Sequence, residues 1–139
     1  MDKNLLKNLW ILAGLLLAIN IGLGLIIIVI VEFLKIGSSN ISNIAGLVAA
    51  MIVGQIYAKN FKEVMPKQLR LNVTIIYTVI TMILELLYLY LVLGFLDALS
   101  LGILIGLSLI YSLFIYWMLG LGGKSYLKVS ERRNVIKKK

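Results

Sequence analysis

The chain has 139 residues, of which 61% are hydrophobic and 14% are charged, with a formal net charge of +8. A soluble domain carries about 25% charged residues, so this composition excludes a water-soluble protein and indicates an integral membrane protein. The sequence contains no Cys and no His, which excludes disulfides, haem ligation by these residues, iron–sulfur clusters and ordinary zinc sites. We therefore expect no metal and no cofactor.

Four apolar runs follow one another along the chain, at about residues 9–31, 41–58, 73–96 and 98–122. A helix of about 20 apolar residues crosses the ~30 Å hydrocarbon core of a bilayer, and the second run is at the short end of the usual range. Each run is expected to be helical, because open sheet edges cannot be satisfied in lipid and the alternation of a β-barrel is missing. The first run is too long for a cleaved signal peptide and is expected to remain as a helix.

The short connections between the runs predict an all-α fold, an integral membrane four-helix bundle with antiparallel, up-down-up-down helices. The bundle forms a single transmembrane domain over residues 1–139. Pro66 suits the beginning of the third helix, and Asp97 is expected to cap the fourth. Three glycines, Gly120, Gly122 and Gly123, are expected to end the fourth helix, leaving a basic tail at residues 124–139.

The distribution of basic residues predicts the orientation. All but one of the 14 Lys and Arg residues lie near the two termini or between the second and third runs, and the exception is Lys35. The positive-inside rule then places both termini in the cytoplasm. The basic tail is expected to bind anionic lipid headgroups, at about 1 kcal/mol per basic group. Nucleic acid is not an expected partner, because no aromatic or glycine-rich pattern accompanies the lysines.

Small residues recur every four positions in two of the runs. The second run contains Gly46, Ala50 and Gly54 at this spacing, and the fourth begins with Ala98, Gly102 and Gly106. Small side chains on one helix face let a neighbouring helix approach closely. We therefore expect both rows to be sites of helix packing.

The third run carries a polar stripe. Its residues are spaced by three or four positions, so they share one helix face, and they are Thr74, Thr78, Thr81, Glu85 and Tyr88. A carboxyl group that faced lipid at the centre of a span would be unsatisfied. We therefore expect this face to lie against protein or water. The threonines alone are interpreted as structural, because a Thr hydroxyl often bonds a carbonyl of its own helix.

Polar residues near the middle of the other runs are candidate partners for Glu85. They are Asn20 in the first run and Ser108, Tyr111 and Ser112 in the fourth. No Lys or Arg lies at this depth, so the neutral acid is the expected form, able to donate a hydrogen bond to Asn20 or to a hydroxyl. Such a group is a functional hypothesis by default. The alternative is a structural hydrogen bond of ~0.6 kcal/mol that fixes helix register.

One segment carries a resemblance. It runs Ala49-Ala50-Met51-Ile52-Val53-Gly54-Gln55-Ile56-Tyr57-Ala58-Lys59 and is followed by Pro66 and Leu71. This segment resembles an uncharacterised family of small bacterial inner-membrane proteins with four predicted spans. That family carries an Ala-Ala…Gly-Gln-aromatic segment before a basic, proline-containing loop. The resemblance implies a multi-pass protein of the bacterial inner membrane and brings no established activity.

Four spans, short connections and no cofactor ligands favour a small helper or binding protein of the inner membrane. Its expected partner, besides the lipid bilayer, is a membrane protein or a second copy of the chain. The sharpest form of this hypothesis is immunity to a membrane-acting toxin, through packing against the toxin's inserted helices.

The alternative is a small oligomeric transporter with Glu85 as its proton-coupled carboxyl. Small four-span exporters carry their essential acid in the first helix, where this chain has only Asn20. An enzyme is not expected, because the acids Glu32, Glu85 and Asp97 and the Ser and Tyr hydroxyls are the only candidate catalytic groups.

Overall fold

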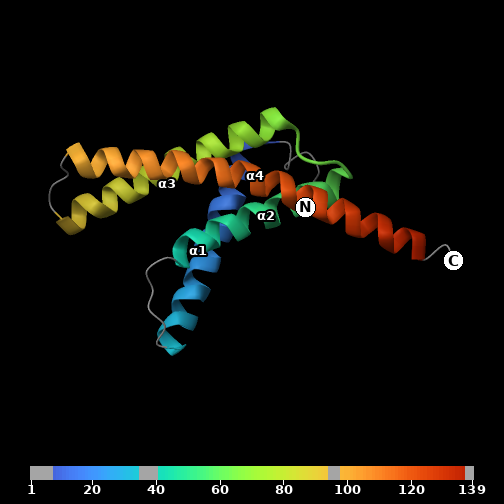
Figure 1. The fold of residues 1–139 in the computed structure, drawn as a ribbon, viewed down its shortest axis with the longest axis horizontal. Helices are drawn as coiled ribbons and strands as arrows, with labels where there is room; N and C mark the ends of the chain where they lie inside the picture. Colours follow the sequence, from blue (N-terminus) through green and yellow to red (C-terminus); the bar gives the residue numbers. More distant parts are fainter. Residues whose placement is uncertain (1–7, 35–40, 94–97, 137–139) are drawn as a thin grey trace.

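The computed structural model describes residues 8–34, 41–93 and 98–136, and within these residues the chain is all-α. The helices are α1 (Leu9–Leu34), α2 (Ile41–Phe61), α3 (Lys67–Leu93) and α4 (Ala98–Ile136) (Figure 1). All four are long and apolar enough to cross a membrane. The prediction of an all-α chain with four candidate membrane spans is therefore confirmed, while Asp97 lies outside the described residues.

Local hydrogen bonds and backbone geometry set several helix ends. The Asn8 side chain caps α1, since its Oδ1 accepts the Trp10 N–H at 3.0 Å. After α2 ends, Lys62 adopts a left-handed φ of 61°, a conformation that closes many helices. The Pro66 carbonyl accepts the Arg70 N–H at 3.0 Å. Pro66 therefore begins the third helical segment, as the sequence indicates.

The prediction that the fourth helix ends at its glycines is wrong. α4 has 39 residues and continues through Gly120, Gly122 and Gly123 to Ile136. None of the three glycines has the left-handed φ of a helix end. They are buried instead, and a Cβ on Gly122 would collide with the Met51 carbonyl of α2. These glycines therefore serve close packing, and the described part of the basic tail prolongs the helix.

The four helices cross near the middle of the molecule, and the α3–α4 pair, the end of α1 and the last part of α4 extend from there in different directions (Figure 1). α3 and α4 lie side by side and run in opposite directions, while α1 crosses them steeply. The most extensive helix–helix contact is between α2 and α4. The bundle therefore has one shared core, and the second half of α3 and the first half of α4 extend beyond it as a two-helix arm.

The core occupies the region of convergence. Beyond it, large apolar side chains are exposed, including Val29 of α1, Leu91 of α3 and Leu107 of α4. Apolar surface of this extent is expected where side chains contact lipid. The buried side chains of the core include Leu12 and Leu16 of α1, Ala49, Ala50 and Val53 of α2, Val73 and Tyr77 of α3, and Ile115 and Leu119 of α4.

The small-residue row of α2 lies against α4. Gly46, Ala50 and Gly54 are all buried. A Cβ on Gly54 would collide with the Leu119 carbonyl and lie 3.2 Å from the Gly123 nitrogen. The two backbones approach each other here because neither α2 at Gly54 nor α4 at Gly123 carries a side chain.

The row at the start of α4 lies in a different environment. A Cβ added to Gly102 or Gly106 would meet no atom within 4 Å. Neither residue therefore packs closely against another helix of the described chain, and packing of this row against a partner's helix stays a prediction. The reason is that they lie on the arm, beyond the reach of α2. The surroundings of the Ala98 side chain are outside the described residues.

We predict that Gly54→Ala destabilises the protein by about 1–3 kcal/mol, because the new methyl group must displace a backbone carbonyl of α4. The matched control is Gly102→Ala, which adds the same methyl group to open space and should change stability by at most about 1 kcal/mol. The measurement is the unfolding transition in mixed detergent micelles, followed by circular dichroism. Equal stability of the two variants would contradict the close approach of α2 to α4.

Candidate functional site

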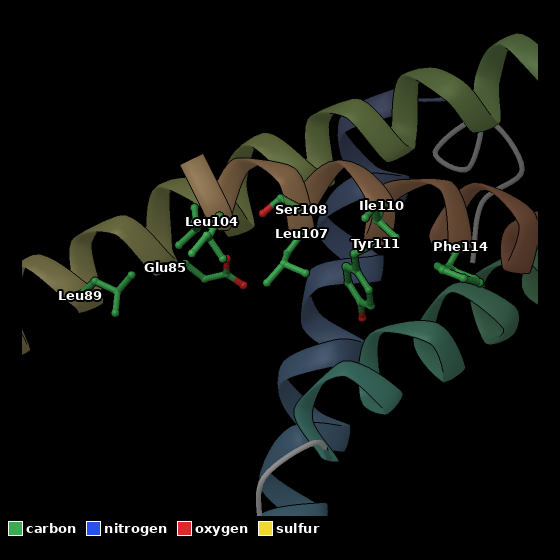
Figure 2. A pocket seen from close by; sticks show the side chains of 9 residues that line it. Glu85, Leu89, Leu104, Leu107, Ser108, Ile110, Tyr111 and Phe114 are labelled. Atoms are coloured by element: carbon green, nitrogen blue, oxygen red, sulfur yellow. The ribbon is translucent and has the colours of Figure 1, made fainter. Parts of the chain in front are cut away.

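Glu85 lies on the arm, and its side chain is exposed in the structure. It borders a hollow of about 540 Å³ along α3 and α4, shown in Figure 2 and called here the Glu85 hollow. Leu104 and Leu107 form part of the apolar lining, and the Ser108 hydroxyl and the Tyr111 ring supply polar atoms. In Figure 2 the Glu85 carboxylate points toward Leu107, and the Tyr111 hydroxyl points toward α2. The structure therefore brings Glu85, Ser108 and Tyr111 to one hollow.

Asn20, which the sequence suggests as a partner of Glu85, instead donates a hydrogen bond to Tyr77. The distance from Asn20 Nδ2 to the Tyr77 hydroxyl is 2.8 Å. The Tyr77 hydroxyl also forms a hydrogen bond with the Tyr111 hydroxyl. Both hydroxyls lie beside Gly46, where an added Cβ would be 3.1 Å from Tyr77 and would collide with Tyr111. A polar chain thus connects α1, α3 and α4 next to a glycine of α2.

The polar stripe of α3 separates into three environments. Thr74 is buried and Thr78 half-buried, whereas Glu85 and Tyr88 are exposed, Tyr88 by 65%. Thr81 lies between them and donates to the carbonyls of Tyr77 and Thr78 of its own helix, at 3.0 and 3.1 Å. The other described helices therefore do not cover Glu85 and Tyr88, and the expectation that the stripe faces protein or water stays a prediction for these two residues. The reason is that α3 leaves the shared core before it reaches them (Figure 1).

The candidate residues of α4 also have different surroundings. Ser112 donates to the Leu109 carbonyl of its own helix at 2.7 Å. Ser108 borders the Glu85 hollow and also a groove on α3 and α4 that contains Thr74 and Thr78. The polar residues near the middle of the helices therefore do not form one layer. Asn20, Tyr77 and Tyr111 form a hydrogen-bonded chain, whereas the Glu85 hollow and the groove with Thr74 and Thr78 are separate sites on α3 and α4.

Sequence reasoning missed two residues of these sites, Tyr77 and Arg70. Tyr77 is four residues before Thr81, and Arg70 is four residues before Thr74, so helical spacing places both near the polar stripe. The Arg70 guanidinium lies over the Tyr116 ring, 4.7 Å from its centroid. From its sequence position, Arg70 is expected in the connection between the second and third runs. It lies instead on α3, which begins at Lys67.

No family model, no curated protein and no solved structure matches this chain. Within the described residues, no group of three His, Cys, Asp or Glu side chains lies close enough to hold a metal ion. The chemistry available at the Glu85 hollow is that of one carboxyl group beside two hydroxyls. Such a group forms strong hydrogen bonds with a partner or exchanges a proton.

We predict that Tyr77→Phe destabilises the protein by about 1 kcal/mol, because it removes the hydroxyl between Asn20 and Tyr111 and leaves a half-buried amide with one partner fewer. Tyr88→Phe is the matched control, since the Tyr88 ring is exposed. The measurement is the same unfolding transition in mixed micelles. Asn20→Leu should cost less in the Tyr77→Phe background than in the parent protein, and full additivity of the two changes would argue against the hydrogen bond.

Proposed function

We propose that the protein is a small helper protein of the bacterial inner membrane that binds another membrane protein through the Glu85 side of the arm. The supporting observation is the exposed carboxyl group of Glu85 on a pair of apolar helices that the other described helices do not cover. A charged acid at the centre of a membrane helix costs about 3 kcal/mol on insertion scales. A partner that bonds this carboxyl recovers part of that cost, which favours docking as the role of the arm.

The proposal includes a topology, in which four spans run up-down-up-down and both termini are cytoplasmic. The distribution of Lys and Arg along the chain supports it. The structure agrees in one respect: the α2–α3 connection lies against α4, since a Cβ on Gly123 would be 3.4 Å from Val64. Lys62, Lys67 and Lys124, which flank this contact in the sequence, are all exposed. The resemblance of residues 49–71 to a bacterial family supports the choice of membrane.

The surroundings of Glu85 define the chemistry of the partner. Leu84, Tyr88, Leu89 and Leu104 border a second hollow that includes Glu85, so the acid is surrounded by apolar surface. A transmembrane helix with an amide, a hydroxyl or a basic group at the same depth fits this surface. An inserted helix of a toxin has this form, which is the immunity version of the proposal, and a second copy of the chain is another such partner.

We predict that a photo-crosslinking amino acid at position 88 captures a discrete membrane protein in native membranes. The matched control is position 90, because Tyr90 is also an aromatic residue of α3, is 59% exposed, and lies about 140° from Glu85 around the helix. Glu85→Leu should abolish the position-88 product. Glu85→Gln, which keeps the hydrogen-bonding atoms, should retain most of it.

The identity of the captured protein separates the versions of this proposal. Capture of the product of a neighbouring toxin gene, together with rescue of growth on co-expression, supports immunity. Capture of the chain itself supports homo-oligomerisation. Equal products from positions 88 and 90, or a position-88 product that survives Glu85→Leu, would remove Glu85 as the docking residue.

A small oligomeric transporter is the second candidate, and one observation favours it. Glu85 shares its hollow with Ser108 and Tyr111, and Tyr111 is hydrogen-bonded through Tyr77 to Asn20. A titratable acid beside a row of hydroxyls and an amide is an arrangement that supports proton transfer within a membrane.

For this candidate, we predict that Glu85→Gln abolishes proton-driven flux in vesicles that contain the purified protein, because an amide cannot titrate. The vesicles are loaded with a pH indicator and tested with a panel of small cations. Tyr88→Phe is the control that should leave flux unchanged, since its ring is exposed on the same helix face. Flux that survives Glu85→Gln excludes proton coupling at this residue.

A further inference from the structure

A groove of about 400 Å³ lies along α3 and α4, nearer the basic end than the Glu85 hollow, and is called here the Thr74 groove. Apolar side chains form most of its lining. The hydroxyl-bearing residues Thr74, Thr78, Ser108 and Ser112 also border it. A volume of this size is within the range of about 300–1,000 Å³ that is usual for ligand sites. The apolar lining includes Leu71, Ile75 and Met82 of α3 and Ile105, Leu109 and Leu113 of α4.

Two hydroxyls of this groove have no hydrogen-bond partner. Thr74 is 4% exposed, and its Oγ1 is buried and unpaired, as is the Oγ1 of Thr78. Other hydroxyls of the same helices, those of Thr81, Ser112 and Ser125, donate to carbonyls of their own helix. Unpaired buried hydroxyls are costly, so the two threonines are polar groups that the described helices leave unsatisfied beside the groove.

A permanent positive charge lies next to the groove, on Arg70, which contacts the lining residue Tyr116. Arg70 is one helical turn before Thr74, and its guanidinium stacks on Tyr116, which borders the groove. The Arg70 Nε is buried without a hydrogen-bond partner, and among the described residues Arg70 makes no ion pair. A guanidinium stays charged at any physiological pH. An apolar groove with hydroxyl-bearing residues in its lining therefore lies beside a cation that has no ion-pair partner among the described residues.

We propose that the Thr74 groove binds one anionic phospholipid of the inner leaflet. The phosphate accepts hydrogen bonds from the Arg70 guanidinium, and one acyl chain lies along the apolar lining. Guanidinium and phosphate form paired hydrogen bonds, and basic pockets between membrane helices on the cytoplasmic side bind anionic headgroups. This site depends on the proposed topology but not on Glu85, so either proposal can fail while the other stands.

The test uses the full-length protein, purified in detergent and freed of lipid, with lipid binding measured by native mass spectrometry. The probes are phosphatidylglycerol and phosphatidylethanolamine with identical acyl chains. We expect one phosphatidylglycerol per chain, bound at least tenfold more tightly than phosphatidylethanolamine. Arg70→Gln should weaken phosphatidylglycerol binding about tenfold. Lys67→Gln removes the same charge from an exposed residue three positions earlier and should change binding less than twofold.

A second variant separates loss of the site from loss of folding. Leu109 borders the groove and is exposed, so Leu109→Trp fills the groove while Arg70 and the buried core stay intact. It should abolish retention of phosphatidylglycerol while circular dichroism shows unchanged helix content. The proposal is overturned if both lipids bind equally, if Leu109→Trp retains the lipid, or if inorganic phosphate at millimolar concentration displaces it, which would indicate a phosphate site instead.

Discussion

The close approach of α2 to α4 is the constraint on which the rest of the structure depends. Gly54 on α2 meets the backbone of α4 at Leu119, and Gly122 on α4 meets the backbone of α2 at Met51, so neither contact leaves room for a side chain. Both contacts lie where the helices converge. Because the helices are fixed together there and cross at an angle, the second half of α3 and the first half of α4 extend away from α1 and α2 on one side (Figure 1). The arm that carries Glu85 is a geometric consequence of this contact.

The position of a polar group relative to this contact decides how it is satisfied. Near the core, Tyr77 reaches Asn20 across the helices, because Gly46 of α2 leaves room for its hydroxyl. Thr81 reaches only its own helix. Among the described residues, no further helix packs on the arm, and Glu85 is exposed. Among the candidate residues, Glu85 is thus left exposed by the fold, whereas Asn20 and Thr81 form hydrogen bonds within it.

Hydropathy alone predicted the four helices, because a span of lipid imposes length and apolarity on the sequence directly. It did not predict the end of α4, since Gly122 and Gly123 suit a helix end and a helix contact equally well, and only the presence of α2 decides between them. Depth alone did not predict the partner of Asn20, because crossing angles determine which groups at one level meet. Because the sequence does not give the crossing angles, Gly102 and Gly54 both fit the pattern of a helix-packing residue. Only Gly54 lies against another helix.

Position along the arm distinguishes the two proposed sites. Arg70 and Glu85 are both on α3, fifteen residues apart, which corresponds to about 22 Å along a helix. If Arg70 is at the level of the headgroups, Glu85 is therefore deep in the hydrocarbon, where no phosphate reaches it. A lipid headgroup can satisfy the first residue, whereas only another membrane protein, or water admitted by an oligomer, can satisfy the second. Ser108 borders both sites, so whatever occupies the Thr74 groove also contributes to the shape of the Glu85 hollow.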